Sequence, residues 1–240
     1  MASLTFLGTG NYLAQGRWWN SLVVDGTVLV EPSPSSLPQL RRAGVRAADL
    51  THVLVSHFHP DHTFGWPFLV LELIEDARPA DRPLHVVGPA GVAAYLDEMM
   101  RLGSVSELHR ELFERSDVRF VEVDGDWQDV GGLRLRAVEV DHVPDLACYG
   151  YLLERRPDLV LGYSGDTRPC DGVDELAEHA DVLVLECNGT HEAKSHMDVG
   201  SVRSLHERFP STRLLLTHVG ADVVPPDGVE LPDDLATYEL

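Results

Sequence analysis

The sequence has few cysteines, no long apolar stretch and no leader-like segment at its start. Three cysteines in 240 residues, widely spaced and without a CxxC pair, fit reduced thiols better than a disulfide framework. The longest apolar candidate, residues 68–74, contains Glu72 and is too short to span a bilayer. Residues 1–6 hold no basic region that leads into an apolar one, so no signal peptide is expected. These absences predict a cytoplasmic protein that does not enter a membrane.

Basic residues are also scarce. The chain has 19 Lys and Arg against 39 Asp and Glu, which gives a formal net charge of −20. Such a charge repels polyanions and opposes the counterion release that drives binding to nucleic acid. We therefore expect nucleic acid not to be a partner. Residues 221–240 contain no Lys or Arg, and we expect this acidic tail to be solvated surface.

Length and even composition favour one domain that covers residues 1–240. Hydrophobic periodicity places strands at 3–7, 21–24, 27–30, 52–55 and 84–87, and helices at 37–43, 67–76, 89–102 and 107–115. Strands at 118–123, 133–140, 148–154 and 159–163 are expected as antiparallel hairpins, before a helix at 173–179, a strand at 182–186, a helix at 199–209 capped by Asp198, and a strand at 214–217. Two β-rich halves, each followed by helices, predict stacked sheets with helices outside.

Four potential metal ligands stand within six residues, directly after the strand expected at residues 52–55. His57 and His59 are two residues apart, so in an extended chain both point to the same side and can reach one ion. Asp61 and His62 lie beyond the intervening proline and can face a second ion. Imidazole and carboxylate together favour Zn²⁺, with Mn²⁺ or Fe²⁺ as alternatives. Exposed loop residues or hydrogen-bonded core histidines would rarely produce this density.

Three further candidates stand where later strands are expected to end. They are His142, Asp166 and His218. Each alone is weak evidence, because a single His or Asp after a strand is more often a cap or turn residue. Together with the first four residues they can complete two coordination shells.

The order of these residues resembles the metallo-β-lactamase superfamily. The resemblance rests on His57-x-His59-x-Asp61-His62, then His142, Ser164-Gly165-Asp166-Thr167 and Leu216-Thr217-His218. It implies an α/β fold, the four-layer αββα sandwich, with two divalent metal ions. By this resemblance His57, His59 and His142 hold one ion, Asp61, His62 and His218 hold the other, and Asp166 bridges them. Dimerisation is common in the family, so the resemblance also raises a homodimer as an option.

Within the superfamily, the segments FLGTG at residues 6–10 and VGP at 87–89 are similar to the branch that contains tRNase Z and related phosphodiesterases. His196, ahead of an expected helix, is similar to that branch's motif histidine, which assists protonation of the leaving group. Asp198 stands where the family usually has Thr or Ser. The alternative for His196 is a solvated helix cap.

Charge counting indicates what such a site favours. Two divalent ions, two aspartates and a bridging hydroxide leave a net positive charge, which suits a small-molecule anionic substrate. We expect a binuclear hydrolase in which the metal-bridged hydroxide attacks, Asp61 belongs to the catalytic centre and His196 protonates the departing group. Between His62 and His142 we expect helices and short loops, without the inserted arm rich in Gly, Pro and basic residues with which the family holds tRNA. A small phosphodiester is therefore the preferred substrate.

Other functions use the same ligands. The metals serve a carbonyl substrate equally well, such as a lactone, thioester or β-lactam. Processing of the tRNA 3′ end is a further alternative, and a non-enzymatic metal-binding or regulatory role comes from a different class of protein. Trp18 and Trp19 either wall a pocket for an aromatic substrate or pack on a sheet, and the sequence does not distinguish the two.

Overall fold

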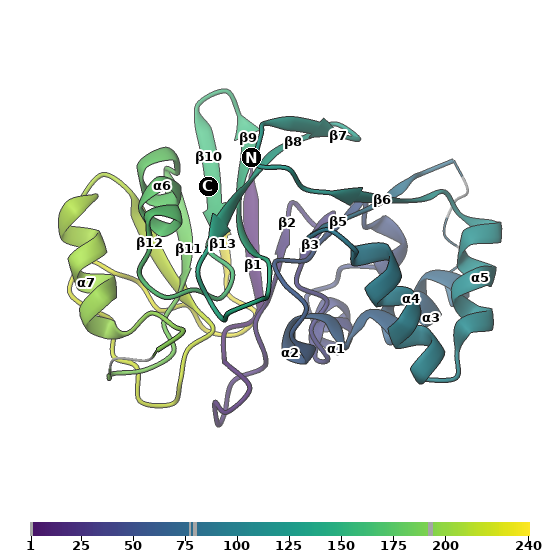
Figure 1. Cartoon of the computed structure of the whole chain (residues 1–240), viewed down its shortest axis with the longest axis horizontal. Coiled ribbons are helices and arrows are strands. Elements are labelled where there is room, and N and C mark those ends of the chain that lie inside the picture. Colours follow the sequence, from purple (N-terminus) through teal and green to yellow (C-terminus); the bar gives the residue numbers. More distant parts are fainter. Residues whose placement is uncertain (1, 77, 79–80, 192–193) are drawn as a thin grey trace.

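Two β-sheets lie face to face, with helices α1 to α5 on one outer side and α6 and α7 on the other (Figure 1). The computed structural model of the chain describes residues 2–76, 78, 81–191 and 194–240. The layers confirm the predicted α/β fold, a four-layer αββα sandwich. Among the described helices, none is long and apolar enough to cross a membrane.

The first sheet has the strand order β13-β1-β2-β3-β4-β5-β6. Its first strands form antiparallel hairpins, whereas β3 to β6 are parallel and need crossover connections. The strands are β1 (Ser3–Gly8), β2 (Ser21–Val24), β3 (Val28–Val30), β4 (His52–Leu54), β5 (Leu84–Gly88), β6 (Val118–Glu122) and β13 (Thr237–Glu239). The helices of this half are α1 (Ser36–Arg42), the 3₁₀ helix η1 (Ala47–Asp49), α2 (Pro60–Thr63), α3 (Trp66–Glu75), α4 (Val92–Leu102) and α5 (Ser106–Arg115).

The second sheet has the order β12-β11-β10-β9-β8-β7. Its middle strands β8, β9 and β10 are antiparallel, and β10, β11 and β12 are parallel, so the ends of β10 and β12 lie at the same edge. The strands are β7 (Gln128–Val130), β8 (Leu133–Val140), β9 (Cys148–Arg156), β10 (Leu159–Tyr163), β11 (Val182–Glu186) and β12 (Arg213–Thr217), and the helices are α6 (Asp171–His179) and α7 (Val199–Arg208).

The space between the sheets is filled by side chains from both. Phe6 of β1, Leu135 of β8 and Tyr151 of β9 are fully buried there. Separate apolar clusters lie under the helices, with Trp66 on the first sheet and Leu176 on the second. Burial of each such side chain stabilises the fold by about 1.5–3 kcal/mol. The three apolar clusters therefore hold the two sheets and the helices against one another.

Two predictions about this architecture are wrong. The strand at 118–123 does not form a hairpin with the following strands; β6 pairs parallel with β5, because α4 and α5 return the chain to the same sheet. The acidic tail is not simply solvated, since β13 pairs antiparallel with β1 and Val229 is buried. Asp234 in this tail accepts hydrogen bonds from the backbone and hydroxyl of Thr9, which fixes it to the turn after β1.

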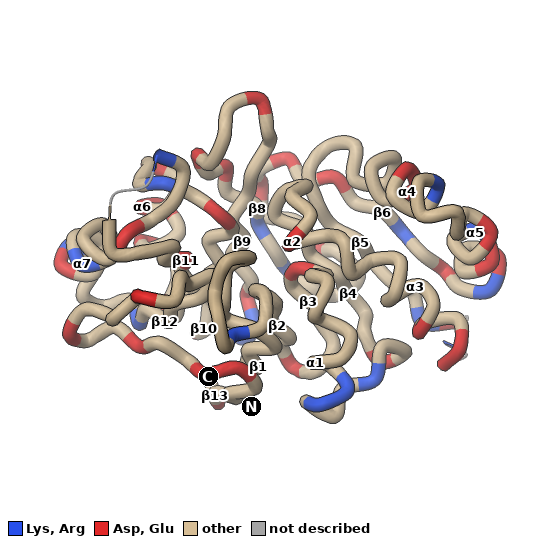
Figure 2. The backbone as a smooth tube through the Cα atoms, turned by 90° about the horizontal axis from the view of Figure 1, so that it is seen from below, with Lys and Arg blue, Asp and Glu red and all other residues tan. Residues whose placement is uncertain are grey.

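Charged residues are spread over the surface. Figure 2 shows Lys and Arg interspersed with the more numerous Asp and Glu along the chain. The net charge of −20 is therefore distributed over both halves and is not confined to the acidic tail.

Candidate metal centre

All seven predicted ligands meet at one edge of the two sheets. Four follow β4, two on the loop after it and two in the short helix α2, and the other three follow β8, β10 and β12. The parallel register of β10 to β12 brings two of these strand ends together, and β8 reaches them through β9. The predicted ligand residues are His57, His59, Asp61, His62, His142, Asp166 and His218.

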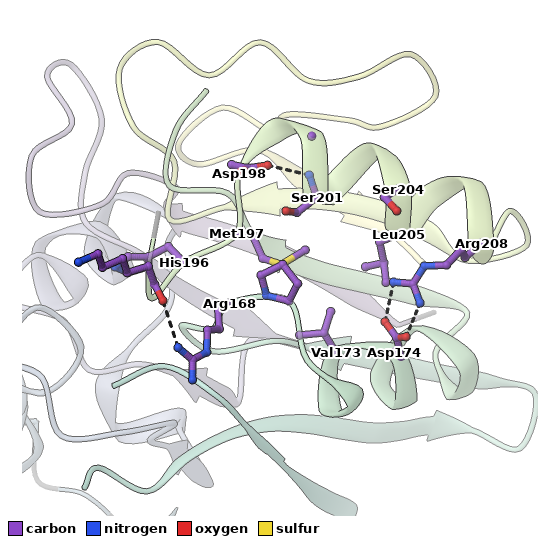
Figure 3. A pocket seen from close by; sticks show the side chains of 13 residues that line it. Arg168, Val173, Asp174, His196, Met197, Asp198, Ser201, Ser204, Leu205 and Arg208 are labelled. Atoms are coloured by element: carbon purple, nitrogen blue, oxygen red, sulfur yellow. Dashed lines mark hydrogen bonds and ion pairs between the residues drawn. The ribbon is translucent and has the colours of Figure 1, made fainter. Parts of the chain in front are cut away.

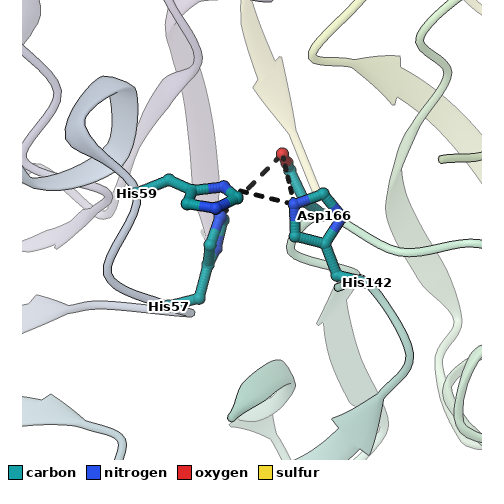
Figure 4. A group of neighbouring side chains, drawn as sticks. All are labelled: His57, His59, His142 and Asp166. Carbon is teal, nitrogen blue, oxygen red and sulfur yellow. Dashed lines mark hydrogen bonds and ion pairs between the residues drawn. The ribbon is translucent and has the colours of Figure 1, made fainter. Parts of the chain in front are cut away.

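The first group is formed by His57, His59, His142 and Asp166. Their potential ligand atoms all lie within 4.8 Å of one another. His142 Nε2 is 3.2 Å from His59 Nδ1 and 3.9 Å from Asp166 Oδ2. Figure 4 shows the imidazole rings arranged around the aspartate carboxylate. This is the donor set and the spacing that a single divalent ion would require.

The second group is formed by Asp61, His62 and His218, again within 4.8 Å of one another. His218 Nε2 is 3.4 Å from Asp61 Oδ2. Asp166 contacts this group too, with Oδ1 at 3.3 Å from His62 Nε2 and Oδ2 at 3.5 Å from His218 Nε2. The carboxylate of Asp166 therefore lies between the two groups and reaches both.

Neighbouring residues fix which ring nitrogen faces the centre. His142 donates from Nδ1 to the carbonyl of Ser195 at 2.8 Å, which leaves Nε2 free. Ser56 Oγ is 2.8 Å from His57 Nδ1 and can donate or accept there, and His57 Nε2 lies toward Asp166, at 4.0 Å from Oδ2. Such contacts orient metal-binding histidines and set their tautomer.

Glu31 and His218 have left-handed backbones, with φ of 59° and 50°. This conformation is unfavourable for residues with a side chain, and it is retained where the surroundings require it. Glu31 is fully buried and directs Oε2 to within 3.6 Å of His62 Nδ1. The strained backbone thus places one carboxylate and one imidazole of the centre.

The centre fits divalent cations. His57 Nε2, both ring nitrogens of His62 and Asp166 Oδ1 are buried without hydrogen-bond partners among the described residues. Three buried carboxylates, those of Glu31, Asp166 and Glu186, have only histidines as ion-pair partners in the described part of the chain. A buried negative charge without a positive partner is costly. Bound cations would supply positive charge to the carboxylates and partners to the unpaired ring nitrogens.

The pKa values point the same way. Burial would raise the pKa of Asp166, but His218 and His62 outweigh it and hold the pKa well below the ordinary value, so the carboxylate is anionic. Burial and the nearby His62 lower the pKa of His57, which keeps its lone pair available. For His62, burial acts downward, yet Asp166 and Glu31 raise the pKa well above its ordinary value. The carboxylates of Asp166 and Glu31 therefore stabilise a positive charge at this position, either on protonated His62 or on a cation in the second group.

His196 lies beside the ligands, with its ring centroid 4.8 Å from that of His142. Its Nδ1 is 2.9 Å from Glu186 Oε1, and Glu186 also accepts a hydrogen bond from Thr167 N. Burial lowers the pKa of His196, which makes its protonated ring a stronger acid, and burial together with Asp166 raises the pKa of Glu186. The predicted N-cap is also present, since Asp198 Oδ1 accepts from Ser201 N at 2.7 Å.

Glu31 and Glu186 also belong to the centre, although their positions in the sequence do not predict it. Glu31 follows β3 and Glu186 ends β11, and both are fully buried. A single Glu at a strand end carries no spacing signal, so only the folded structure relates it to the histidines. The one hint for Glu31 and Glu186 is their position after apolar runs, where a carboxylate is expected to need a partner.

Two hollows near the centre share no lining residue: one is lined by His196, and the other is lined by predicted ligands. One, of about 640 Å³, is polar and includes His196, Arg168, Lys194 and Ser201 (Figure 3). The other, of about 460 Å³, is lined by His59, Asp61 and several aromatic side chains, with Trp19 among them. Trp19 therefore lines a pocket beside the centre, which was one of the two alternatives for this residue.

Comparison with known proteins identifies the family. A family model described as "Beta-lactamase superfamily domain" matches residues 26–219. Among solved structures, a diphosphatase from the PhnP family has a TM-score of 0.80 at 19% identity, covering 100% of this chain and 98% of that chain. The chain belongs to the metallo-β-lactamase superfamily and is, by class, a metal-dependent hydrolase.

Within the superfamily, relatives named Ribonuclease Z match this chain. Ribonuclease Z from Methanosarcina mazei is 26% identical over 296 aligned positions, which cover 100% of this chain and 94% of the relative. Ribonuclease Z from Mycobacterium marinum is 32% identical over 196 positions, which cover 77% and 70%. Human tRNase Z, short form, shares the fold with a TM-score of 0.77 at 19% identity, covering 99% and 98%. These names conflict with the expectation that nucleic acid is not a partner.

Proposed function

We propose that this chain hydrolyses phosphodiesters with two divalent metal ions. The observation that carries the proposal is the Asp166 carboxylate, which lies 3.3 Å from His62 Nε2 and 3.5 Å from His218 Nε2 while also belonging to the first ligand group. His57, His59 and His142 would hold one ion, Asp61, His62 and His218 the other, and Asp166 both. Such a pair of ions supplies Lewis acidity toward water and toward both oxygens of an in-line displacement.

His196 is the residue that would move the proton. In hydrolysis a water oxygen forms a bond to phosphorus, the bond to the leaving oxygen breaks, and that oxygen takes up a proton. Glu186 occupies Nδ1 of His196, so Nε2 is the atom that would donate it. Glu186 acts as a positioning residue, because it holds the ring in one orientation beside the ligands.

A small phosphodiester is the preferred substrate, and RNA is the second candidate. The relatives named Ribonuclease Z favour RNA. Three observations favour a small molecule: the net charge of −20, the scattered Lys and Arg in Figure 2, and the length of the alignment with the Methanosarcina mazei relative. That alignment spans 296 positions whereas this chain has 240 residues, so the relative carries insertions without a counterpart here. A polyanion would therefore find less to hold it.

The test combines metal content with turnover of three substrates. We expect two metal ions per chain and hydrolysis of bis-p-nitrophenyl phosphate that chelation abolishes and Zn²⁺, Mn²⁺ or Fe²⁺ restores. Purified precursor tRNA and a lactone panel are assayed in parallel with the same metal-loaded protein. Efficient cleavage of precursor tRNA would support the RNA candidate, and lactone turnover alone would contradict phosphodiester chemistry. A protein that binds no metal would overturn the proposal.

A further inference from the structure

The cleft of about 460 Å³ opens directly on the ligand residues. His59 and Asp61 form part of its wall, and the rest is provided mainly by Tyr12, Trp19 and Phe64. Tyr12 is 60% exposed and Phe64 is 47% exposed, so both rings are accessible to a ligand in the cleft. Because the wall includes two predicted metal ligands, a group that fills the cleft lies next to the reacting centre.

The aromatic side chains stand on a fixed backbone. Tyr12 and Trp19, the two residues of the β1–β2 loop that provide aromatic rings to this cleft, are each adjacent to a buried asparagine. Asn11 N donates a 3.0 Å hydrogen bond to the carbonyl of Val219, directly after a metal-ligand histidine. Asn20 Nδ2 donates to the hydroxyl of Tyr163 at 2.7 Å in the buried core. The loop is therefore tied to the second sheet at both ends.

Phe64 is fixed from the other side. It follows α2, the short helix that carries Asp61 and His62. The next residue is Gly65, where an added Cβ would lie 2.1 Å from the carbonyl oxygen of Ser33, so this turn packs closely on the loop after β3. The three aromatics thus form a preformed wall, which lowers the entropic cost of binding a flat group.

The chemistry of this wall differs from that of the other flank. Apart from Asp61, its lining residues carry no charged carboxylate, Lys or Arg. The flank near His196 is polar, with Arg168 and Lys194 in its lining. Aromatic walls bind flat rings by stacking, which strengthens binding by about 10- to 100-fold per stacked base.

We infer that this cleft binds a flat aromatic group on the ester that stays attached to phosphorus. His196, the proton donor for the leaving oxygen, lines the other hollow and not this one. The leaving alcohol therefore occupies the polar flank, and the retained group faces Tyr12, Trp19 and Phe64. This inference rests on the proposed phosphodiesterase function and specifies its substrate class, a phosphodiester of a nucleoside or of a phenol.

The first experiment uses diesters with an identical leaving group. Thymidine 5′-p-nitrophenyl phosphate, phenyl p-nitrophenyl phosphate and methyl p-nitrophenyl phosphate all release p-nitrophenol and differ only in the retained group. We expect kcat/KM for the two aromatic esters to exceed that for the methyl ester by about 10- to 100-fold, as stacking energies of this size predict. An advantage of thymidine over phenyl identifies a nucleotide base as the natural occupant, and equality identifies any aryl group.

Matched variants locate the effect. Trp19→Ala and Phe64→Ala should lower kcat/KM for the two aromatic esters by a larger factor than kcat/KM for the methyl ester, so that the ratio between them falls toward one. The controls are Trp18→Ala and Phe68→Ala, because both side chains are similarly exposed, at 47% and 57%, but do not line this cleft. The controls should retain the wild-type preference. Equal loss in test and control variants would overturn the assignment.

A binding measurement separates this inference from the proposed function. Phenylphosphonate and methylphosphonate are titrated into the metal-loaded protein by calorimetry, which needs no turnover. Tighter binding of phenylphosphonate that is lost in Trp19→Ala and Phe64→Ala supports the cleft even if no diester is hydrolysed, in which case the proposed function alone fails. Equal affinity of wild type for the two phosphonates would overturn the inference even if diesters are hydrolysed.

Discussion

The two halves of the molecule contribute to the centre in different ways. The N-terminal half provides four predicted ligands, which follow β4 on the loop and in the short helix α2, so their spacing depends on a few residues of local chain. The C-terminal half provides three ligands, each after a different strand, so their geometry depends on the register of β8 to β12. Asp166, the carboxylate that reaches both groups, belongs to the half without a local motif. The position of Asp166 between the two groups therefore depends on how the strands of the second sheet pair.

Removing Asp166 gives the sharpest test of this comparison. Asp166→Asn should lower the bound metal from two ions per chain and reduce kcat/KM by more than about 10³-fold, beyond the roughly 10- to 100-fold cost of losing a group that only orients a ligand. Asp61→Asn alters only one of the two groups, so it should lower the affinity for mainly one of the two ions. Metal analysis and diester hydrolysis measure both effects.

The matched control is Asp158→Asn, at the opposite end of the same strand, β10, where the side chain is 84% exposed. It should leave metal content and turnover unchanged. Retention of two ions in Asp166→Asn would contradict the bridging position and with it the contrast between the halves.

The same contrast decides what could be predicted from the sequence. The contiguous ligands His57, His59, Asp61 and His62 are visible as a spacing pattern, and the strands around them follow from hydrophobic periodicity. His142, Asp166 and His218 are visible only as single residues at expected strand ends, which is weak evidence for each, because pairing of strands far apart in sequence brings them together.

The parallel pairing of β6 and the docking of the acidic tail were mispredicted for a related reason. The residues of a strand do not by themselves determine which strand it pairs with. The contact between Asp234 and Thr9 likewise cannot be predicted from the residues near either one. Glu31 and Glu186 were missed because a buried carboxylate resembles any other Glu until its neighbours are known. Long-range contacts therefore account for each of these failures.

The His196–Glu186 pair tests the role of the C-terminal half beyond metal binding. His196→Ala should reduce hydrolysis of diesters with a poor alkyl leaving group by about 10²-fold, since such an oxygen needs a proton as it departs. Diesters that release p-nitrophenol should be much less affected, because that leaving group departs as an anion. Metal content should stay at the wild-type value, as measured on the same samples.

Glu186→Gln should produce the same leaving-group dependence in weaker form, because Glu186 acts through the ring it contacts at 2.9 Å. In the double variant the two losses should not add, as expected for residues that act as a unit. A uniform loss with every leaving group would instead indicate that the pair only maintains the structure.

His52 provides the smallest test and concerns the contact between the halves. It lies on β4, stacks on His85 with ring centroids 5.1 Å apart, and its Nε2 is 2.7 Å from the carbonyl oxygen of Val130 on β7. Burial, with a contribution from His85, lowers the pKa of His52 below its ordinary value of 6.5, although the Val130 carbonyl acts in the opposite direction. Between the two pKa values the unfolded chain binds more protons than the folded chain, so stability falls as pH drops below about 6.5.

His52→Gln removes this proton uptake and can keep a donor for Val130. The free energy of unfolding of wild type should therefore fall more steeply than that of the variant below pH 6.5, by at most about 1.4 kcal/mol per pH unit, the limit for one proton. Urea denaturation of the metal-free proteins between pH 7.5 and 5 measures the difference. His179→Gln, at an exposed position on α6, is the control and should keep the wild-type slope. Identical slopes for all three proteins would show that protonation of His52 does not weaken the contact between the two sheets.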